Sequence, residues 1–163
     1  LLAAAPSVVE CDVRFALPLT WPSYSSLCQR PEMQRVAFRD TLAAEPDPGL
    51  APQEVVIAQA YGLHCGRVDV CFRFASPSNK AVTGPLERFE GFFQASARYR
   101  SMLLCEAFHL AAADSRAGEE QIDFQVCFTA KGGGEHNYLW QLVKQRAPEV
   151  AGCWMTEGVI PID

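Results

Sequence analysis

Residues 67–74 constrain the fold most strongly, because apolar and polar residues alternate along this segment without interruption. In an extended chain one face would carry Val68, Val70, Phe72 and Phe74, and the other would carry Arg67, Asp69, Cys71 and Arg73. A period of two is typical of a strand with one buried face and one solvated face. Residues 9–17 and 121–129 show the same alternation. We therefore expect three half-buried strands whose apolar faces turn towards a common core.

A fourth strand is expected from residues 55–61, which are apolar and contain three β-branched residues. The loop 62–66 begins and ends with glycine and would join this strand to residues 67–74 as an antiparallel hairpin.

Apolar residues recur at helical spacing in three other segments. These are residues 31–42, residues 85–113 and residues 137–146. A straight helix over 85–113 would be too long for this domain, so we expect a bend near residues 96–101. The tail, residues 148–163, would pack as a last strand or as an ordered arm.

The predicted order is strand, helix, strand, strand, helix, strand, and then a helix and the tail. Strands separated by helices need crossover connections, which are right-handed. The simplest solution is an α+β fold: a ferredoxin-like split βαβ sandwich (βαββαβ) with an extra C-terminal helix and an ordered tail. The length of 163 residues suits a single domain over 1–163, in which residues 1–8 would form an extended arm.

The second face of this predicted sheet would be polar. It would carry Arg14, Asp69, Arg73, Asp123 and Gln125. Such a face is either solvated or buried against a partner. Because no catalytic or cofactor motif stands out, the leading hypothesis is a non-enzymatic structural or assembly module. It would dock on other protein subunits through the sheet face or the C-terminal tail.

A pocket between the sheet and the helices is the alternative hypothesis. Its walls would be formed by Phe72, Phe89, Phe93 and Phe124, and the protein would then be a small-molecule binding protein or an enzyme. The same phenylalanines would equally serve as plain core residues.

Charge and hydropathy exclude some partners. The formal net charge of -5 argues against nucleic acid and anionic membrane surfaces, which require clustered lysine and arginine. No apolar run reaches the length of a membrane span, and the longest candidate, residues 101–113, contains Glu106 and His109.

The cysteines and the first residues point to an oxidising compartment. Seven cysteines are many for this length, and disulfides persist mainly outside the cytosol. Residues 1–5 are either the end of a targeting segment, with Ala3 and Ala5 at an Ala-x-Ala-like site, or a plain apolar arm. We therefore expect an extracellular, cell-surface or organelle-lumen location, with Cys28 and Cys153 as a disulfide that fixes the tail. Cys71 and Cys127 would lie on strands about 10 Å apart, beyond disulfide reach.

Three groups of residues could carry chemistry, and none supports an assigned site. Residues 131–134, Lys-Gly-Gly-Gly, would lie between a strand and a helix but lack the spacing of a phosphate-binding loop. Cys105 and His109, four apart on a predicted helix, would form a zinc site only with ligands from elsewhere in the chain. Those additional ligands would come from His64, Cys65 and His136.

Cys65 beside His64 is also a candidate nucleophile and base, although no oxyanion hole is evident. We therefore assign no catalytic residue, no metal and no cofactor.

Residues 36–43 (VAFRDTLA), 52–57 (PQEVVI), Gly62 and 68–74 (VDVCFRF) resemble a recurrent module of large algal and protist surface proteins. That module follows F-R-x-x-L-A with P-x-x-V-x-I and G-x-V-x-V-x-F, and it has a SEA-like, ferredoxin-like fold. The chain departs from it at Glu45-Pro-Asp-Pro48 and at Leu63-His-Cys65. The resemblance implies a non-catalytic structural or adhesive module outside the cytosol, and it carries over no functional residues.

Overall fold

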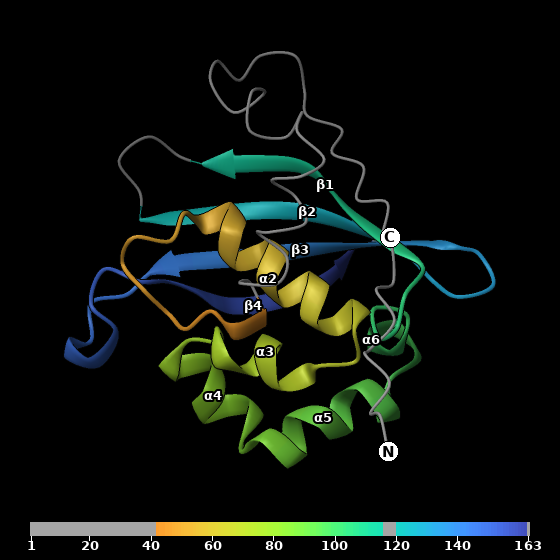
Figure 1. Cartoon of the computed structure of the whole chain (residues 1–163), viewed down its shortest axis with the longest axis horizontal. Coiled ribbons are helices and arrows are strands. Elements are labelled where there is room, and N and C mark those ends of the chain that lie inside the picture. Colours follow the sequence, from red (N-terminus) through yellow and green to blue (C-terminus); the bar gives the residue numbers. More distant parts are fainter. Residues whose placement is uncertain (1–41, 116–119, 163) are drawn as a thin grey trace, which may run out of the picture.

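The computed structural model describes residues 42–115 and 120–162, which form helices and one antiparallel sheet in an α+β arrangement (Figure 1). Helices come first in this part of the chain, and strands follow. The helices are α2 (Pro52–His64), α3 (Val68–Arg73), α4 (Pro77–Thr83), α5 (Leu86–Ala95) and α6 (Ala97–Arg100). The strands are β1 (Ala107–Ser115), β2 (Gln121–Thr129), β3 (Glu135–Lys144) and β4 (Trp154–Ile162), with a 3-10 turn at Pro148–Val150 between the last two.

The sheet is a simple meander in the order β1-β2-β3-β4, with every neighbouring pair antiparallel. Register shifts interrupt the pairing between Leu110 and Ala112 on β1 and between Gln141 and Leu142 on β3. Such bulges bend a strand and strengthen its twist. The edge strand β4 is linked to the helical part of the chain by an isolated parallel bridge between Ala75 and Thr156.

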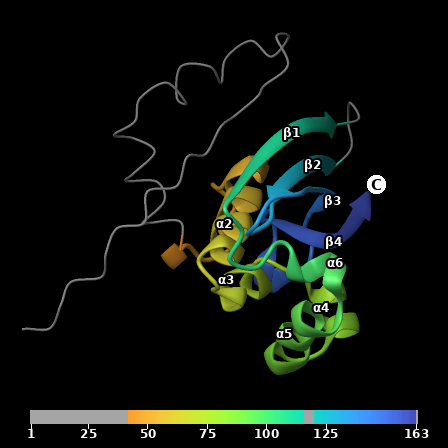
Figure 2. The same ribbon diagram turned by 90° about the vertical axis from the view of Figure 1, so that its right-hand side faces the viewer.

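Helix α2 lies across one face of the sheet, and α4, α5 and α6 lie beyond the β4 edge (Figures 1 and 2). The core forms where α2 meets the strands, and its central side chains from the sheet are Phe124, Phe128, Tyr138 and Trp140. The ring of Phe128 lies 5.5 Å from Tyr138 and 6.0 Å from Trp140 between ring centroids. These aromatic contacts anchor the middle of β2 and β3 against the helix.

The predicted strands at 55–61 and 67–74 are wrong, because both segments are helical. Helix α2 begins with proline in its first turn, and the Ala51 N–H donates to the Glu54 carboxylate at 2.7 Å, which satisfies one free donor of the helix start. The helix is buried on nearly all sides, so its sequence lacks the polar face that would reveal a helical period.

Helix α3 explains why the alternation in residues 67–74 was misleading. Cys71, assigned to the polar face, is buried together with Val70 and Phe74. Phe72 instead packs against Phe89 of α5 at 5.3 Å between ring centroids. Because α2 packs on one side of α3 and α5 on the other, four of the six residues of α3 are apolar, and their spacing does not report the backbone conformation.

Two predicted helical segments are also strands. Residues 137–146 lie mainly in β3, where Tyr138, Trp140 and Leu142 are fully buried at a period of two. The last part of the predicted helix at 85–113, from Ala107 onwards, is β1. The helix start after Pro85 and the interruption at Ser96 are confirmed, as are the strand at 121–129 and the packing of the tail as a last strand.

The ferredoxin-like order is therefore wrong for the described part of the chain, which runs from helices into a four-stranded meander without the predicted crossovers. An additional C-terminal helix is likewise absent there, because residues 137–146 pair with both β2 and β4. The predicted strand at 9–17, the arm at 1–8 and most of the helix at 31–42 lie outside the described residues.

Gly62 allows α2 and α3 to approach closely, and its replacement by alanine tests this contact. A Cβ at this position would lie 2.9 Å from the buried Cβ of Val70 and 3.1 Å from the Arg67 carbonyl oxygen. We expect G62A to lower the free energy of unfolding by about 2 kcal/mol, because the core must shift to accept the methyl group. The measurement is urea denaturation followed by circular dichroism.

G91A is the matched control within α5, since a Cβ there meets nothing within 4 Å. It should raise the free energy of unfolding by about 0.5–1 kcal/mol through the better helix propensity of alanine. Equal effects of the two substitutions would contradict a tight α2–α3 contact.

Candidate functional site

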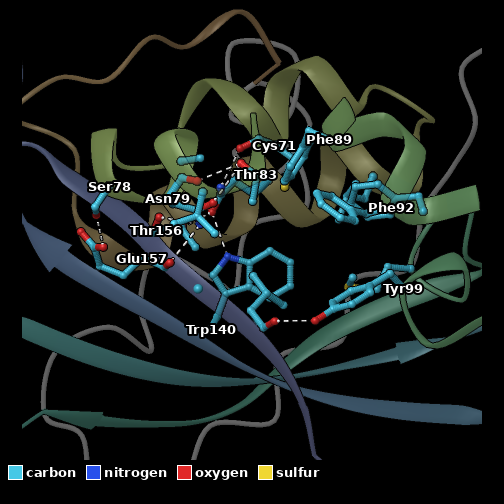
Figure 3. A pocket seen from close by; sticks show the side chains of 18 residues that line it. Cys71, Ser78, Asn79, Thr83, Phe89, Phe92, Tyr99, Trp140, Thr156 and Glu157 are labelled. Atoms are coloured by element: carbon cyan, nitrogen blue, oxygen red, sulfur yellow. Dashed lines mark hydrogen bonds between the residues drawn. The ribbon is translucent and has the colours of Figure 1, made fainter. Parts of the chain in front are cut away.

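A cavity of about 450 Å³ lies between the helices and the β3–β4 half of the sheet (Figure 3). Every described helix contributes to its walls, and β3 and β4 close it from the sheet side. This volume falls in the range of small-molecule sites, and most of the lining is apolar. We therefore treat this cavity as the candidate site.

Aromatic side chains form one end of the cavity. Phe89, Phe92 and Phe93 come from α5, and Tyr99 comes from α6 (Figure 3). The Phe93 ring lies 5.4 Å from Phe89 and 6.5 Å from Tyr99, both nearly edge to face. The Tyr99 hydroxyl donates to the Val159 carbonyl at 3.2 Å, which fixes its ring against β4. This end offers rigid aromatic surfaces to a ligand.

A buried hydrogen-bonded network around Gln59 fixes the floor of the cavity. The Gln59 Oε1 accepts from Trp140 Nε1 at 2.9 Å and from the Thr156 hydroxyl at 2.6 Å. Its Nε2 donates to the Cys71 carbonyl at 2.9 Å. The network joins α2, α3, β3 and β4, and both Gln59 and Trp140 are essentially inaccessible to solvent. The floor is therefore pre-organised.

Polar groups gather at the opposite end, where α4 meets β4 (Figure 3). The Asn79 side-chain amide donates to the carbonyl oxygens of Thr156 at 3.2 Å and Glu157 at 3.0 Å. The Ser78 hydroxyl donates to Glu157 Oε2, and Gln145 Nε2 donates to Glu157 Oε1 at 3.2 Å. The Thr83 hydroxyl donates to the Asn79 carbonyl at 2.9 Å. These contacts hold α4 on the β4 edge.

The cavity lining includes a buried thiol and a carboxylate. Cys71 is the thiol among the lining residues, and complete burial raises its pKa to about 12, so the thiol stays protonated at neutral pH. Glu157 is the carboxylate of the lining, and neither a histidine nor a lysine of the described chain lines the cavity with it. The Ser78 hydroxyl and the Glu157 carboxylate that accepts its hydrogen bond form the hydroxyl–carboxylate pair of this lining.

The residues predicted to form a docking face do not lie on one sheet face. Asp69 and Arg73 belong to helix α3, where Asp69 pairs with Arg67 at 2.8 Å and Arg73 donates to the carbonyl oxygens of Leu42 and Ala44. Two others, Asp123 and Gln125, are on β2. They alternate with the buried Phe124 and Val126, and so lie on the side away from the core. The fifth, Arg14, lies outside the described residues.

Two of the four phenylalanines predicted to line a pocket do so. Phe89 and Phe93 are in the lining, whereas Phe72 packs behind Phe89 and Phe124 lies in the core opposite Trp140 of β3. Trp140 and Tyr99 were missed. The alternation of Tyr138, Trp140 and Leu142 after the glycine turn could have revealed the strand that places Trp140 in the cavity.

Among the described cysteines and histidines that were predicted as zinc ligands or as a nucleophile and base, Cys105 and His64 are in close contact. Cys105 Sγ lies 3.6 Å from His64 Nδ1, and burial lowers the pKa of His64. His109 lies on β1 rather than one helical turn from Cys105. Within residues 42–115 and 120–162, no three metal-binding side chains come together. Cys65 is exposed, but partial burial of its sulfur raises its pKa, which is the wrong direction for an activated nucleophile.

The predicted Cys28–Cys153 disulfide is wrong, because Cys153 is a buried free thiol. Its partner in the prediction, Cys28, lies outside the described residues. Cys71 and Cys127 are also free and buried. Small buried cysteines behave as hydrophobic residues, so their number was a poor guide to disulfides.

The glycines at 132–134 form the hairpin turn between β2 and β3, and all three have positive φ angles. Strand β3 follows them, and not the predicted helix. The Gly132 N–H donates to the Glu106 carboxylate at 3.1 Å. An acidic side chain from the same chain therefore occupies a donor that an anion would need.

No helix in residues 42–115 and 120–162 has both the length and the apolar character needed to cross a bilayer.

Comparison with known proteins supports a fold but not a family. No protein-family model matches the sequence, and no curated protein matches it either. Among solved structures, the chain is similar to the solution structure of a SEC-C motif containing protein from Rhodopseudomonas palustris, with a TM-score of 0.54. The two share 14% sequence identity over 84% of this chain and 98% of the other. At this identity the similarity concerns the fold alone.

The resemblance to the SEA-like module of algal and protist surface proteins is wrong. The similar structure is a bacterial SEC-C motif protein, and the segments that are strands in the module form helices α2 and α3 in this chain. In residues 52–57 and 68–74 the matching letters include buried apolar positions, which both strands and covered helices require.

Proposed function

We propose that this chain binds a small, largely apolar molecule non-covalently in the cavity between its helices and β3–β4. The observation that carries the proposal is a cavity of about 450 Å³ with an aromatic end and a hydrogen-bonded floor. Pockets of this size with few polar groups on mostly apolar walls are typical of ligand sites. The high pKa of the Cys71 thiol supports binding rather than nucleophilic catalysis.

The aromatic end would supply most of the binding energy. Phe92 is suited to test this, because it lines the cavity while 38% of its surface remains exposed, so its removal should cost little stability. We expect the neutral probe 2-naphthylmethanol to bind the full chain, and F92A to weaken that binding roughly tenfold through loss of ring contacts. Isothermal titration calorimetry gives the dissociation constants.

L104A is the matched control, since Leu104 is similarly exposed but is not in the lining. It should leave the dissociation constant unchanged within twofold. Equal weakening by F92A and L104A, or no binding of the probe at all, would contradict a ligand site in this cavity.

Docking on other protein subunits stays a prediction from the sequence, as does a location outside the cytosol or in an organelle lumen. The C-terminal tail proposed for docking is the edge strand β4, and it includes Ile160, which is 46% exposed. The β4 edge is covered from Thr156 to Val159 by α4, the segment before it and Tyr99, so a further strand from a partner would have to pair with β4 beyond Val159. Analytical ultracentrifugation at rising concentration tests this role, and a strictly monomeric protein would argue against self-assembly through β4.

A further inference from the structure

The two ends of the cavity differ in chemistry, and this difference constrains the ligand. Phe92 and Tyr99 mark the apolar end, and Asn79, Ser78 and Glu157 mark the polar end, with Trp140 between them (Figure 3). A ligand that fills the cavity therefore meets aromatic rings at one end and oxygen atoms at the other.

Hydrogen-bond donors at the polar end are engaged within the protein. Both hydrogens of the Asn79 amide are directed to β4 carbonyl oxygens, and the hydroxyl hydrogens of Ser78 and Thr83 are directed to Glu157 and the Asn79 carbonyl. A ligand carboxylate or phosphate arriving here would need to displace these bonds.

Acceptor capacity remains at the same place. The Glu157 carboxylate accepts one bond at each oxygen, from Ser78 and Gln145, and a carboxylate offers about four acceptor positions. The Asn79 Oδ1 has only a long contact of 3.4 Å with the Thr83 hydroxyl, whose better bond is to the Asn79 main chain. The polar end therefore suits a ligand that donates hydrogen bonds.

The charged residues in and around the cavity also favour a positively charged ligand. Glu157 is the charged residue in the lining. Lys80, which follows Asn79 on α4, donates to the Arg73 carbonyl at 3.0 Å and lies over the Phe72 ring, and neither Lys80 nor Arg73 lines the cavity. Arg88 stacks on Phe92 at the rim without joining the lining.

We propose that the ligand of this cavity is an organic ammonium cation with an apolar body, oriented with its nitrogen towards Glu157 and its body against the aromatic end. This inference rests on the proposed function, since it names the ligand class of the same cavity.

Three probes that share one apolar body and differ in charge test the inference on the full chain. They are 2-naphthylmethylamine, 2-naphthylmethanol and 2-naphthoate, compared by isothermal titration calorimetry at low and at physiological salt. We expect the amine to bind about tenfold more tightly than the naphthoate, because one partly screened charge pair is worth about this factor. Equal or tighter binding of the naphthoate would overturn the charge assignment.

E157Q removes the charge and keeps an oxygen that can accept the hydrogen bond from the Ser78 hydroxyl. It should weaken amine binding about tenfold and leave the binding of 2-naphthylmethanol unchanged within twofold. E90Q, an exposed position on α5 outside the lining, is the matched control and should change neither. An amine-to-naphthoate ratio that E157Q leaves unchanged would refute the role of Glu157.

The outcomes separate the two proposals. If 2-naphthylmethanol binds and the amine and the naphthoate bind equally tightly, the ligand class is wrong and the binding function stands. If none of the three probes binds, the binding function itself is wrong.

Discussion

Replacing Gln59 with leucine should lower the free energy of unfolding by about 4 kcal/mol, one of the two largest effects we expect from a single substitution. The leucine keeps most of the volume but removes the acceptor for Trp140 Nε1 and the Thr156 hydroxyl and the donor to the Cys71 carbonyl. Each buried polar group left without a partner costs about 1–3 kcal/mol. Urea denaturation monitored by circular dichroism measures the change.

Removing the partners as well tests whether unsatisfied polar groups cause the loss. T156V and W140F delete the two groups that donate to Gln59 Oε1 while retaining similar shapes. In a chain that carries Q59L, T156V and W140F together, the loss should be smaller than the sum of the three separate losses, because fewer buried polar groups remain unpaired. Q94L, the same substitution at an exposed position on α5, should change the free energy of unfolding by less than about 0.5 kcal/mol. Strictly additive losses would contradict a coupled network.

Replacing Trp140 with alanine should also lower the free energy of unfolding by about 4 kcal/mol. The indole is fully buried, contacts Phe128 at 6.0 Å between ring centroids and donates to Gln59. Truncating a large buried aromatic residue leaves a void that the surroundings fill only in part, which typically costs 3–5 kcal/mol. The same denaturation experiment applies.

W140F separates the ring from the hydrogen bond. It keeps most of the packing and loses the Nε1–Gln59 bond, so we expect a loss of about 1.5 kcal/mol. A loss from W140F as large as that from W140A would mean that the hydrogen bond, rather than the packing, dominates the contribution of this residue.

The confirmed predictions share a physical feature. Strand β2 is apolar on one side and polar on the other, and Phe124, Val126 and Phe128 are buried as their alternation predicts. The start of α5 after Pro85 was also predictable, because proline suits the beginning of a helix. In both places local sequence and tertiary environment agree.

The wrong predictions fall where an element is covered on more than one side. Helix α3 is enclosed by α2 and α5, so Val68, Val70, Cys71 and Phe74 are all buried and imitate a strand. In β3, Leu139 and Val143 on the outer positions obscured the inward alternation of Tyr138, Trp140 and Leu142. Hydrophobic periodicity reports secondary structure only when one face meets water.

Most of the candidate site followed from the tertiary structure. Phe89 and Phe93 could be expected from their helical spacing, but Gln59, Asn79, Trp140 and Glu157 come together only because α2, α4, β3 and β4 meet at one edge of the sheet. Gln59 and Glu157, the most distant of these residues, are 98 positions apart in the sequence. No local pattern encodes such distant contacts.

By itself, the sequence determined the α+β class, the strand at Gln121–Thr129 and the helix after Pro85, because each depends on neighbouring residues. The tertiary structure alone decided that residues 52–64 and 68–73 are helical and that residues 135–144 join the sheet. It also decided where the cavity lies. In those segments the long-range burial of apolar surface outweighs local backbone preference, so the environment of each residue selects its conformation.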